Sequence, residues 1–209
     1  TLNKDLNEDL SIINEKSIIL PLGNVKITRK INSLLIILRM NTEVKIWDQT
    51  KKRLFEQPKI EYSIRSINSL IKSIKFCENK YPNLKIKTII IEDRSTKKNL
   101  DLIKKLTQKG NIDIVSLNHE KYKPLIKEQK SEDTFSNLAS LMKSFETGKN
   151  QSEDLVFFVE DDYIHFETML EEMIASYERI ASQIKKDIFI CPSDYPYLYM
   201  NNEKTNVLI

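Results

Sequence analysis

Two acidic clusters in this sequence follow apolar runs, and their side chains suit a metal ion or a nucleoside. Glu160-Asp161-Asp162 comes directly after the apolar run 155–159. Carboxylates this close repel one another unless a cation neutralises them. Because few nitrogen or sulfur donors lie nearby, they suit a hard ion, Mg²⁺ or Mn²⁺, that also binds phosphate oxygens. The alternative is a solvated acidic turn that caps the next helix.

The second cluster, Glu92-Asp93-Arg94-Ser95, comes directly after the predicted strand 86–91. Taken alone, it is also consistent with a simple helix cap. Because both clusters follow predicted parallel strands, we expect them at one edge of the sheet, where ligands of such sheets bind. One cluster is then available to a metal ion, and the other to a ribose or a base.

Asp194 is the candidate general base that deprotonates an acceptor hydroxyl, because it follows the apolar run 188–190. The alternative is an aspartate that shapes a proline-rich turn. The nearby Tyr195, Tyr197 and Tyr199 suit either stacking on a sugar or packing within that turn.

Two histidines complete the candidate groups. His165 lies three residues after Asp162, so it is available to a metal ion or a phosphate. The alternative is a histidine in the first turn of the following helix. His119 has no partner pattern, and we expect it at the surface.

The elements that position these residues alternate between strands and helices. The continuous apolar run 34–38 predicts a strand buried on both faces. Further strands are predicted at 86–91, at 112–117 with Asp113 facing outward, at 155–159 and at 188–190. Spacings of three and four between apolar residues predict helices in between, one capped by Ser63 and two ended by Gly110 and Gly148. The alternation predicts an α/β fold with a doubly wound, mostly parallel sheet and helices on both faces.

Composition excludes several classes of function. The 33 basic and 30 acidic residues leave a net charge of +3, and the lysines form no stripe, so we expect no nucleic-acid partner. With 3 glycines, the chain has no glycine-rich phosphate loop. No apolar run approaches the roughly 18 residues of a membrane span. Cys77 and Cys191 match no zinc spacing, and we expect two buried or half-buried thiols in a reducing, cytoplasmic compartment.

The chain is expected to comprise an extension and one domain. Residues 1–30 are polar with short apolar islands and predict an irregular extension or an edge strand, so the domain occupies 31–209. Val207-Leu208-Ile209 resembles the start of another buried strand. We therefore expect a domain truncated at its C-terminus, incomplete in catalysis and open to self-association through its apolar surface.

Together the two motifs resemble those of the GT-A glycosyltransferases, nearest to the family-2-like bacterial enzymes. An apolar strand runs into Glu-Asp-Arg-Ser-Thr (92–96) and a later one into Val-Glu-Asp-Asp-Tyr (159–163), within a resemblance that covers about 33–200. It implies a Rossmann-like nucleotide-sugar-binding domain. It also implies a metal-dependent, hexosyltransferase-like enzyme that moves a sugar from a nucleotide-diphosphate sugar to a hydroxyl of a glycan, lipid or small-molecule acceptor, with inversion.

The resemblance also implies roles for single residues. Those that border the base would be Arg39, Met40 and Asn41, and those that meet the base or ribose would be Glu92 and Asp93, with the adjoining Arg94. The DXD motif, which serves the ribose and the metal ion, would be Glu160, Asp161 and Asp162, with Asp162 as the direct metal ligand.

The chain departs from this family pattern in three places. Arg94 stands where many relatives have glycine after two acids. Phe135-Ser136-Asn137 replaces the usual glycine and arginine before the DXD motif. No acidic motif for the acceptor follows.

Two other functions compete with a glycosyltransferase. A non-catalytic nucleotide-sugar-binding module would carry the same motifs without an acceptor half. A signalling receiver domain shares the α/β sheet, but it places an acidic pair after the first strand and a lysine after the fifth. Here those positions read Arg39-Met40-Asn41 and Cys191-Pro192-Ser193-Asp194, so the receiver hypothesis fails.

Overall fold

The computed structural model describes residues 4–5, 18–19, 23–43, 56–108, 110–127 and 131–191. The chain divides into two compact units. One unit is Ile31–Glu171, and the other combines Thr1–Lys30 with Glu172–Ile209. The predicted site residues that the structure describes all lie in the unit Ile31–Glu171.

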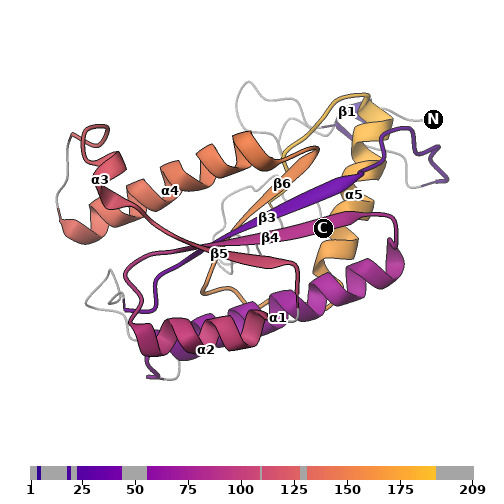
Figure 1. Ribbon diagram of the computed structural model, residues 1–209. Coiled ribbons are helices and arrows are strands. Elements are labelled where there is room, and N and C mark those ends of the chain that lie inside the picture. Colours follow the sequence, from indigo (N-terminus) through magenta and orange to yellow (C-terminus); the bar gives the residue numbers. More distant parts are fainter. Residues whose placement is uncertain are drawn as a thin grey trace. The chain divides into compact units, whose positions relative to one another are not determined.

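This unit is built on a four-stranded, entirely parallel sheet, as the alternating pattern predicted. Its strands are β3 (Ser33–Met40), β4 (Lys85–Glu92), β5 (Ile112–Ser116) and β6 (Leu155–Glu160). They lie in the order β5-β4-β3-β6 (Figure 1). The chain therefore moves outward from β3 to β4 and β5, and then returns to the other side of β3.

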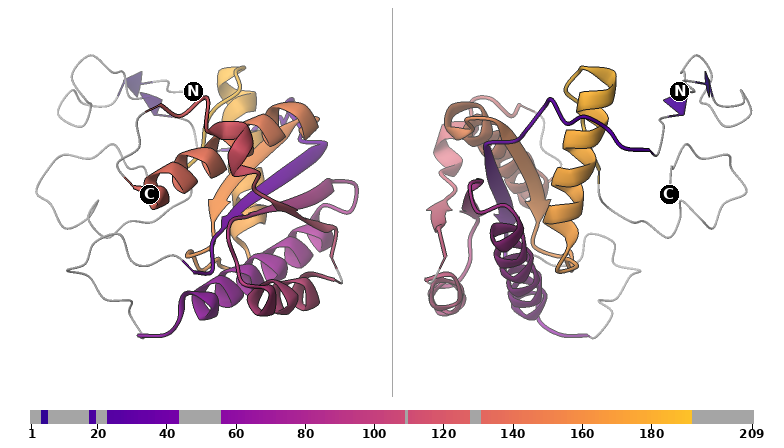
Figure 2. Two further views of the ribbon diagram at one scale, coloured as in Figure 1. Left: turned by 60° about the vertical axis from the view of Figure 1, so that its left-hand side comes forward. Right: turned by 90° about the vertical axis from the view of Figure 1, so that its right-hand side faces the viewer.

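Helices cover both faces of the sheet, which confirms the doubly wound fold. α1 (Lys59–Lys80) and α2 (Lys97–Thr107) lie on one face, and α4 (Glu132–Gln151) lies on the other, as Figures 1 and 2 show. The short α3 (His119–Tyr122) precedes α4. Each crossover on one side of β3 uses the same face, as right-handed connections require.

The core explains why these segments became strands. The apolar run of β3 is buried on both faces, and Ile36, Ile37 and Leu38 are fully enclosed. Toward α4, Leu35 and Ile37 form a cluster with Ile89 and Ile91 of the neighbouring strand. A central parallel strand between two helical layers has no face in water, so alternation gives way to a continuous apolar run.

Three expectations about the elements were wrong. Ser63 does not cap a helix, because α1 begins at Lys59 and buries Ser63. Gly148 does not end α4, which continues to Gln151. The apolar run 188–190 forms no strand.

Gly148 instead allows close packing of α4 on the sheet. A Cβ atom at this position would lie 3.2 Å from the Phe158 ring and 3.5 Å from Ile37. Gly110 follows the end of α2 at Thr107, and its amide donates to the Thr107 carbonyl at 3.1 Å.

The other unit contains a small antiparallel pair, β1 (Lys4–Asp5) and β2 (Ile18–Ile19), and most of α5 (Met169–Ile184). Within this unit, Ser182 Oγ accepts from the amides of Thr28 and Arg29 at 2.9 and 3.0 Å. Asp187 accepts from Arg29 Nε at 3.0 Å and from the Tyr177 hydroxyl at 2.6 Å. Over the described ranges, no helix is long and apolar enough to cross a membrane.

Candidate functional site

The carboxyl edge of the sheet gathers the predicted site residues. The strand order reverses between β3 and β6, and ligands of doubly wound sheets bind at such a point. β3 leads into this edge with Arg39 and Asn41, and β4 with Glu92, Asp93 and Arg94. β6 leads into it with Glu160, Asp161 and Asp162.

The three carboxylates at the end of β6 lie in different environments. Glu160 forms an ion pair with Arg39, its register partner on β3. Asp161 is turned to the opposite face of the sheet, where it is bound by α1. Asp162 is exposed. Two cationic side chains therefore neutralise two of the three acids that the sequence assigned to a metal ion.

Asp161 lies in a buried polar group with Lys59 and Ser63. Its carboxylate accepts from Lys59 Nζ at 2.8 Å and from Ser63 Oγ at 2.5 Å. Burial raises the pKa of Asp161, while Lys59 and the Ser63 hydrogen bond act against that rise. The Lys59–Asp161 ion pair joins the end of β6 to the first turn of α1.

Lys59 and Ser63 were missed as site residues by sequence reasoning, although a signal was present. They lie four residues apart and so share a helix face with Ile67 and Leu70, which are buried. A lysine on the apolar face of a helix predicts a buried carboxylate partner, because an unpaired buried charge is costly.

This geometry limits how a metal ion could be held. No group of three or more His, Cys, Asp or Glu side chains in the described part of the chain is arranged around a common ion site. Asp161 does not fit as a ligand, since Lys59 and Ser63 already bind its oxygens. Asp162 does fit, because it is exposed at the carboxyl edge.

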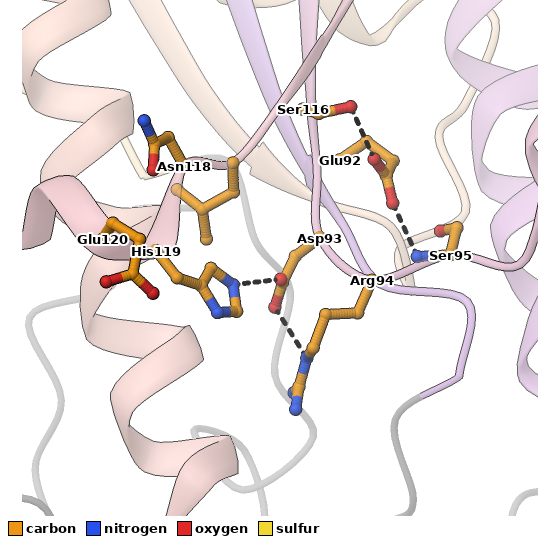
Figure 3. Close-up of a pocket in the computed structure, with 9 residues that line it drawn as sticks. Glu92, Asp93, Arg94, Ser95, Ser116, Asn118, His119 and Glu120 are labelled. Atoms are coloured by element: carbon orange, nitrogen blue, oxygen red, sulfur yellow. Dashed lines mark hydrogen bonds and ion pairs between the residues drawn. The ribbon is translucent and has the colours of Figure 1, made fainter. Parts of the chain in front are cut away.

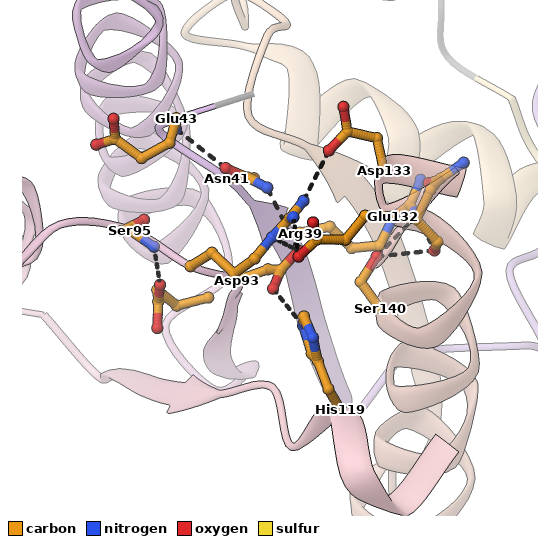
Figure 4. A network of polar contacts seen from close by, with 12 residues as sticks. Arg39, Asn41, Glu43, Asp93, Ser95, His119, Glu132, Asp133 and Ser140 are labelled. Atoms are coloured by element: carbon orange, nitrogen blue, oxygen red, sulfur yellow. Dashed lines mark hydrogen bonds and ion pairs between the residues drawn. The ribbon is translucent and has the colours of Figure 1, made fainter. Parts of the chain in front are cut away.

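Arg39 lies between β6 and α4 at the point where the strand order reverses. Its Nη1 donates to the Asn137 side chain at 2.8 Å, and it lies 3.3 Å from both the Asn137 carbonyl and Ser140 Oγ. Its Nη2 donates to Glu160. Figure 4 shows this guanidinium within a larger polar network.

Glu92 is a structural residue of the turn after β4. Its carboxylate accepts from the Ser95 amide at 2.6 Å and from Ser116 Oγ at 3.0 Å, so it links this turn to β5. The turn contains Arg94 at a φ of 56°. This left-handed conformation costs roughly 1–2 kcal/mol for a residue with a side chain.

Carboxylates around Arg94 hold its side chain and act against that cost. Its guanidinium contacts Asp133 at 2.9 Å, Glu132 at 3.1 Å and Asp93 at 3.5 Å. Burial lowers the pKa of Arg94, but the hydrogen bond to Asp133 and the surrounding acids outweigh this effect, so the pKa lies above its ordinary value. Arg94 thereby connects the turn after β4 to the start of α4.

Asp93 pairs with His119, which the sequence wrongly placed at the surface without a partner. His119 Nε2 lies 2.6 Å from Asp93 Oδ1, and the His119 ring meets Phe135 edge-on at 5.6 Å. Asp93 is buried, and it also accepts from Asn41 Nδ2 at 3.3 Å. No sequence signal indicated the pair, because it depends on how the chain turns after β5.

Asp93 and His119 line an open groove between the ends of β4 and β5 (Figure 3), with a volume of about 350 Å³. Small-molecule sites begin at about 300 Å³. The groove is lined by Glu92, Asp93, Arg94, Ser95, Ser116, Leu117, Asn118, His119 and Glu120.

His165 lies on the α1 side of the sheet rather than in this groove. Its amide donates to Ser69 Oγ at 3.0 Å, and its Nε2 is buried without a hydrogen-bond partner. Burial lowers the pKa of His165 to about 4, so its imidazole is neutral at physiological pH.

No protein-family model, curated protein or solved structure matches this chain. The residues of the site and their geometry are therefore what indicates its chemistry. The candidate base Asp194, and the tyrosines Tyr195, Tyr197 and Tyr199, lie outside the described residues.

The described edge offers groups for two parts of a ligand. The groove presents a buried carboxylate, an imidazole and hydroxyls, which can hydrogen-bond a polar heterocycle or a ribose. The neighbouring strand ends present a guanidinium at Arg39 and a free carboxylate at Asp162, which suit an anion and a cation bound to it.

Proposed function

We propose that this chain is a glycosyltransferase domain that binds a nucleotide-diphosphate sugar and transfers the sugar to an acceptor hydroxyl. One observation carries the proposal: a polar groove of about 350 Å³ and the side chains of Arg39 and Asp162 lie at the carboxyl edge of one parallel sheet. The resemblance of the motifs at 92–96 and 159–163 to those of GT-A glycosyltransferases supports it.

In this proposal the nucleoside occupies the groove beside β4 and β5. A carboxylate has about four acceptor sites, and His119, Asn41 and Arg94 use three of those of Asp93 and hold it in place. Asp93 would accept one hydrogen bond from the base or ribose with the site that remains. Glu92 contributes indirectly, since its oxygens are used to hold the turn 92–95.

The diphosphate lies toward the ends of β3 and β6. Asp162 would hold Mn²⁺ or Mg²⁺ together with the diphosphate oxygens, a coordination typical of hard ions bound to nucleotides. Such an ion, when bound, would supply Lewis-acid stabilisation of the diphosphate leaving group. Asp194 is proposed as the base that takes the proton from the acceptor hydroxyl.

A nucleotide-sugar-binding module without catalysis is the second candidate. One observation favours it: Glu160 and Asp161, two of the three acids of the DXD-like motif, are neutralised by Arg39 and Lys59. Such a module would bind the same donors but would neither hydrolyse nor transfer their sugars.

A thermal-shift screen of UDP-, GDP-, CMP- and dTDP-sugars, with and without Mn²⁺, tests the proposal. At a ligand concentration of about 100 times Kd, binding stabilises by ~2.7 kcal/mol, which raises Tm by about 5–10 °C for a chain of this size. A donor that stabilises is then tested for release of its nucleoside diphosphate. Binding without release would favour the non-catalytic module, and the absence of any shift would reject both candidates.

A further inference from the structure

Arg39 differs from the other basic side chains that contact the strand ends. Lys59 is buried on the α1 side, where Asp161 neutralises it. Arg94 is surrounded by Asp93, Glu132 and Asp133. Arg39 instead lies where the strand order reverses, and its ion-pair partner Glu160 is about half exposed to water.

The guanidinium of Arg39 is oriented without help from Glu160. Nη1 is held by the Asn137 side chain at 2.8 Å and by the Asn137 carbonyl and Ser140 Oγ, each at 3.3 Å. These contacts, all made by Nη1, hold one end of the guanidinium against α4. Its Nη2, which donates to Glu160, is then aimed at the carboxyl edge.

Glu160 is a partner that can leave at little cost. Its side chain is 47% exposed, whereas that of Arg39 is 18% exposed. A carboxylate that is about half exposed regains its full hydration when the pair opens, so its departure costs less than that of a buried partner. The guanidinium, by contrast, has further partners on α4 that do not depend on Glu160.

We infer that Arg39 binds the diphosphate of the ligand and that Glu160 is its exchangeable counter-ion, displaced when the phosphate oxygens arrive. The inference rests on the proposed function for the identity of the ligand. No covalent step is involved, since one anion replaces another on the guanidinium. A diphosphate carries more negative charge than one carboxylate, and its oxygens match the guanidinium fork.

This assignment reverses the effect expected of Glu160. The resemblance to GT-A enzymes implies that Glu160 serves the ribose and the metal ion, so its neutralisation would weaken binding. If Glu160 competes with the diphosphate for Arg39, neutralisation strengthens binding instead. The sign of one substitution therefore separates the two roles.

The experiment is calorimetric titration of the full chain in EDTA with three probes: inorganic diphosphate, UDP or GDP, and the matching nucleoside. Glu160→Gln is expected to tighten binding of inorganic diphosphate and of the nucleoside diphosphate about twofold to fivefold. Arg39→Gln is expected to weaken both on the order of tenfold to a hundredfold, with the nucleoside changed less than about threefold. Arg39→Lys keeps the charge without the guanidinium fork, so it should weaken diphosphate binding less than Arg39→Gln does.

Lys87→Gln is the matched control, because it removes one positive charge from an exposed ion pair with Asp113 in the same sheet. Its titrations should equal those of the parent. Weaker diphosphate binding by Glu160→Gln would overturn the inference, as would equal losses for nucleoside and diphosphate in Arg39→Gln. If no nucleoside binds but diphosphate binding still requires Arg39, the proposed function fails and the diphosphate site remains.

Discussion

Neighbouring carboxylates at the end of β6 have different chemistry because successive side chains of a strand point to opposite faces. Glu160 faces α4 and meets Arg39, whereas Asp161 faces α1 and meets Lys59. Asp162, the next residue along the chain, is exposed. The strand geometry thus leaves one of three adjacent acids available to a ligand.

Asp162→Asn should remove the effect of Mn²⁺ on nucleoside-diphosphate binding and leave the fold intact. The exposed side chain contributes little to stability, while an amide is a poorer ligand for a hard cation than a carboxylate. Calorimetric titrations with Mn²⁺ and with EDTA measure the difference. The metal site is misassigned if Mn²⁺ still strengthens binding in this variant, or if the parent binds equally well in both buffers.

Asp93→Asn should weaken nucleoside binding about tenfold even in EDTA, because a charged, buried acceptor in the groove becomes neutral. Its contacts with His119 and Arg94 change with it, so unfolding is measured in parallel. Asp113→Asn, an exposed acid on β5, is the control. Unchanged affinity for every nucleoside would mean that Asp93 only fixes the turn.

At the scale of elements, α1 is tied to the sheet by a buried ion pair in addition to its apolar face. Lys59, Asp161 and Ser63 are each buried. A complete buried pair adds little net stability, but removing one member leaves a charge without compensation.

Lys59→Met should therefore destabilise the protein by about 3–5 kcal/mol at neutral pH. Without Lys59, burial raises the pKa of Asp161 with less opposition, so its folded pKa lies above its unfolded value. Such a group stabilises the fold below the unfolded pKa, and that contribution is lost as pH rises through the folded pKa. The difference in Tm between parent and variant should grow from acidic to neutral pH.

Lys87→Met provides the matched control, because Lys87 belongs to an exposed pair with Asp113. It should cost less than about 1 kcal/mol. If Lys59→Met costs no more than this control, or if its deficit shrinks as pH rises, the buried pair does not anchor α1.

The sequence predicted the elements better than the contacts between them. Apolar segments identified β3, β4, β5 and β6, and the continuous run of β3 reflects its burial on both faces. The run 188–190 gave the same signal and forms no strand, since pairing depends on a neighbour as well as on composition. The pairs Arg39–Glu160 and His119–Asp93 were not predicted, because they depend on strand register and turn shape.

At the scale of the whole molecule, the two cysteines report on different units. Cys77 lies in α1 of the unit Ile31–Glu171 and is fully buried. Burial, with smaller effects of Glu171 and Glu78, raises its pKa to about 11. Cys191 belongs to the other unit and is exposed, contrary to the expectation of two buried or half-buried thiols.

A thiol reagent should therefore label Cys191 rapidly and Cys77 only when the unit Ile31–Glu171 opens. Because a ligand that binds only the folded unit reduces opening by the factor 1 + [L]/Kd, a bound donor at 100 times Kd should slow labelling of Cys77 about 100-fold. The rate of Cys191 should not change. Mass spectrometry after timed quenching follows both sites, and Cys191→Ser isolates the slow one. Rapid labelling of Cys77 in the free protein would contradict its burial, and a nucleotide sugar that binds without slowing it would mean that α1 opens independently of the site.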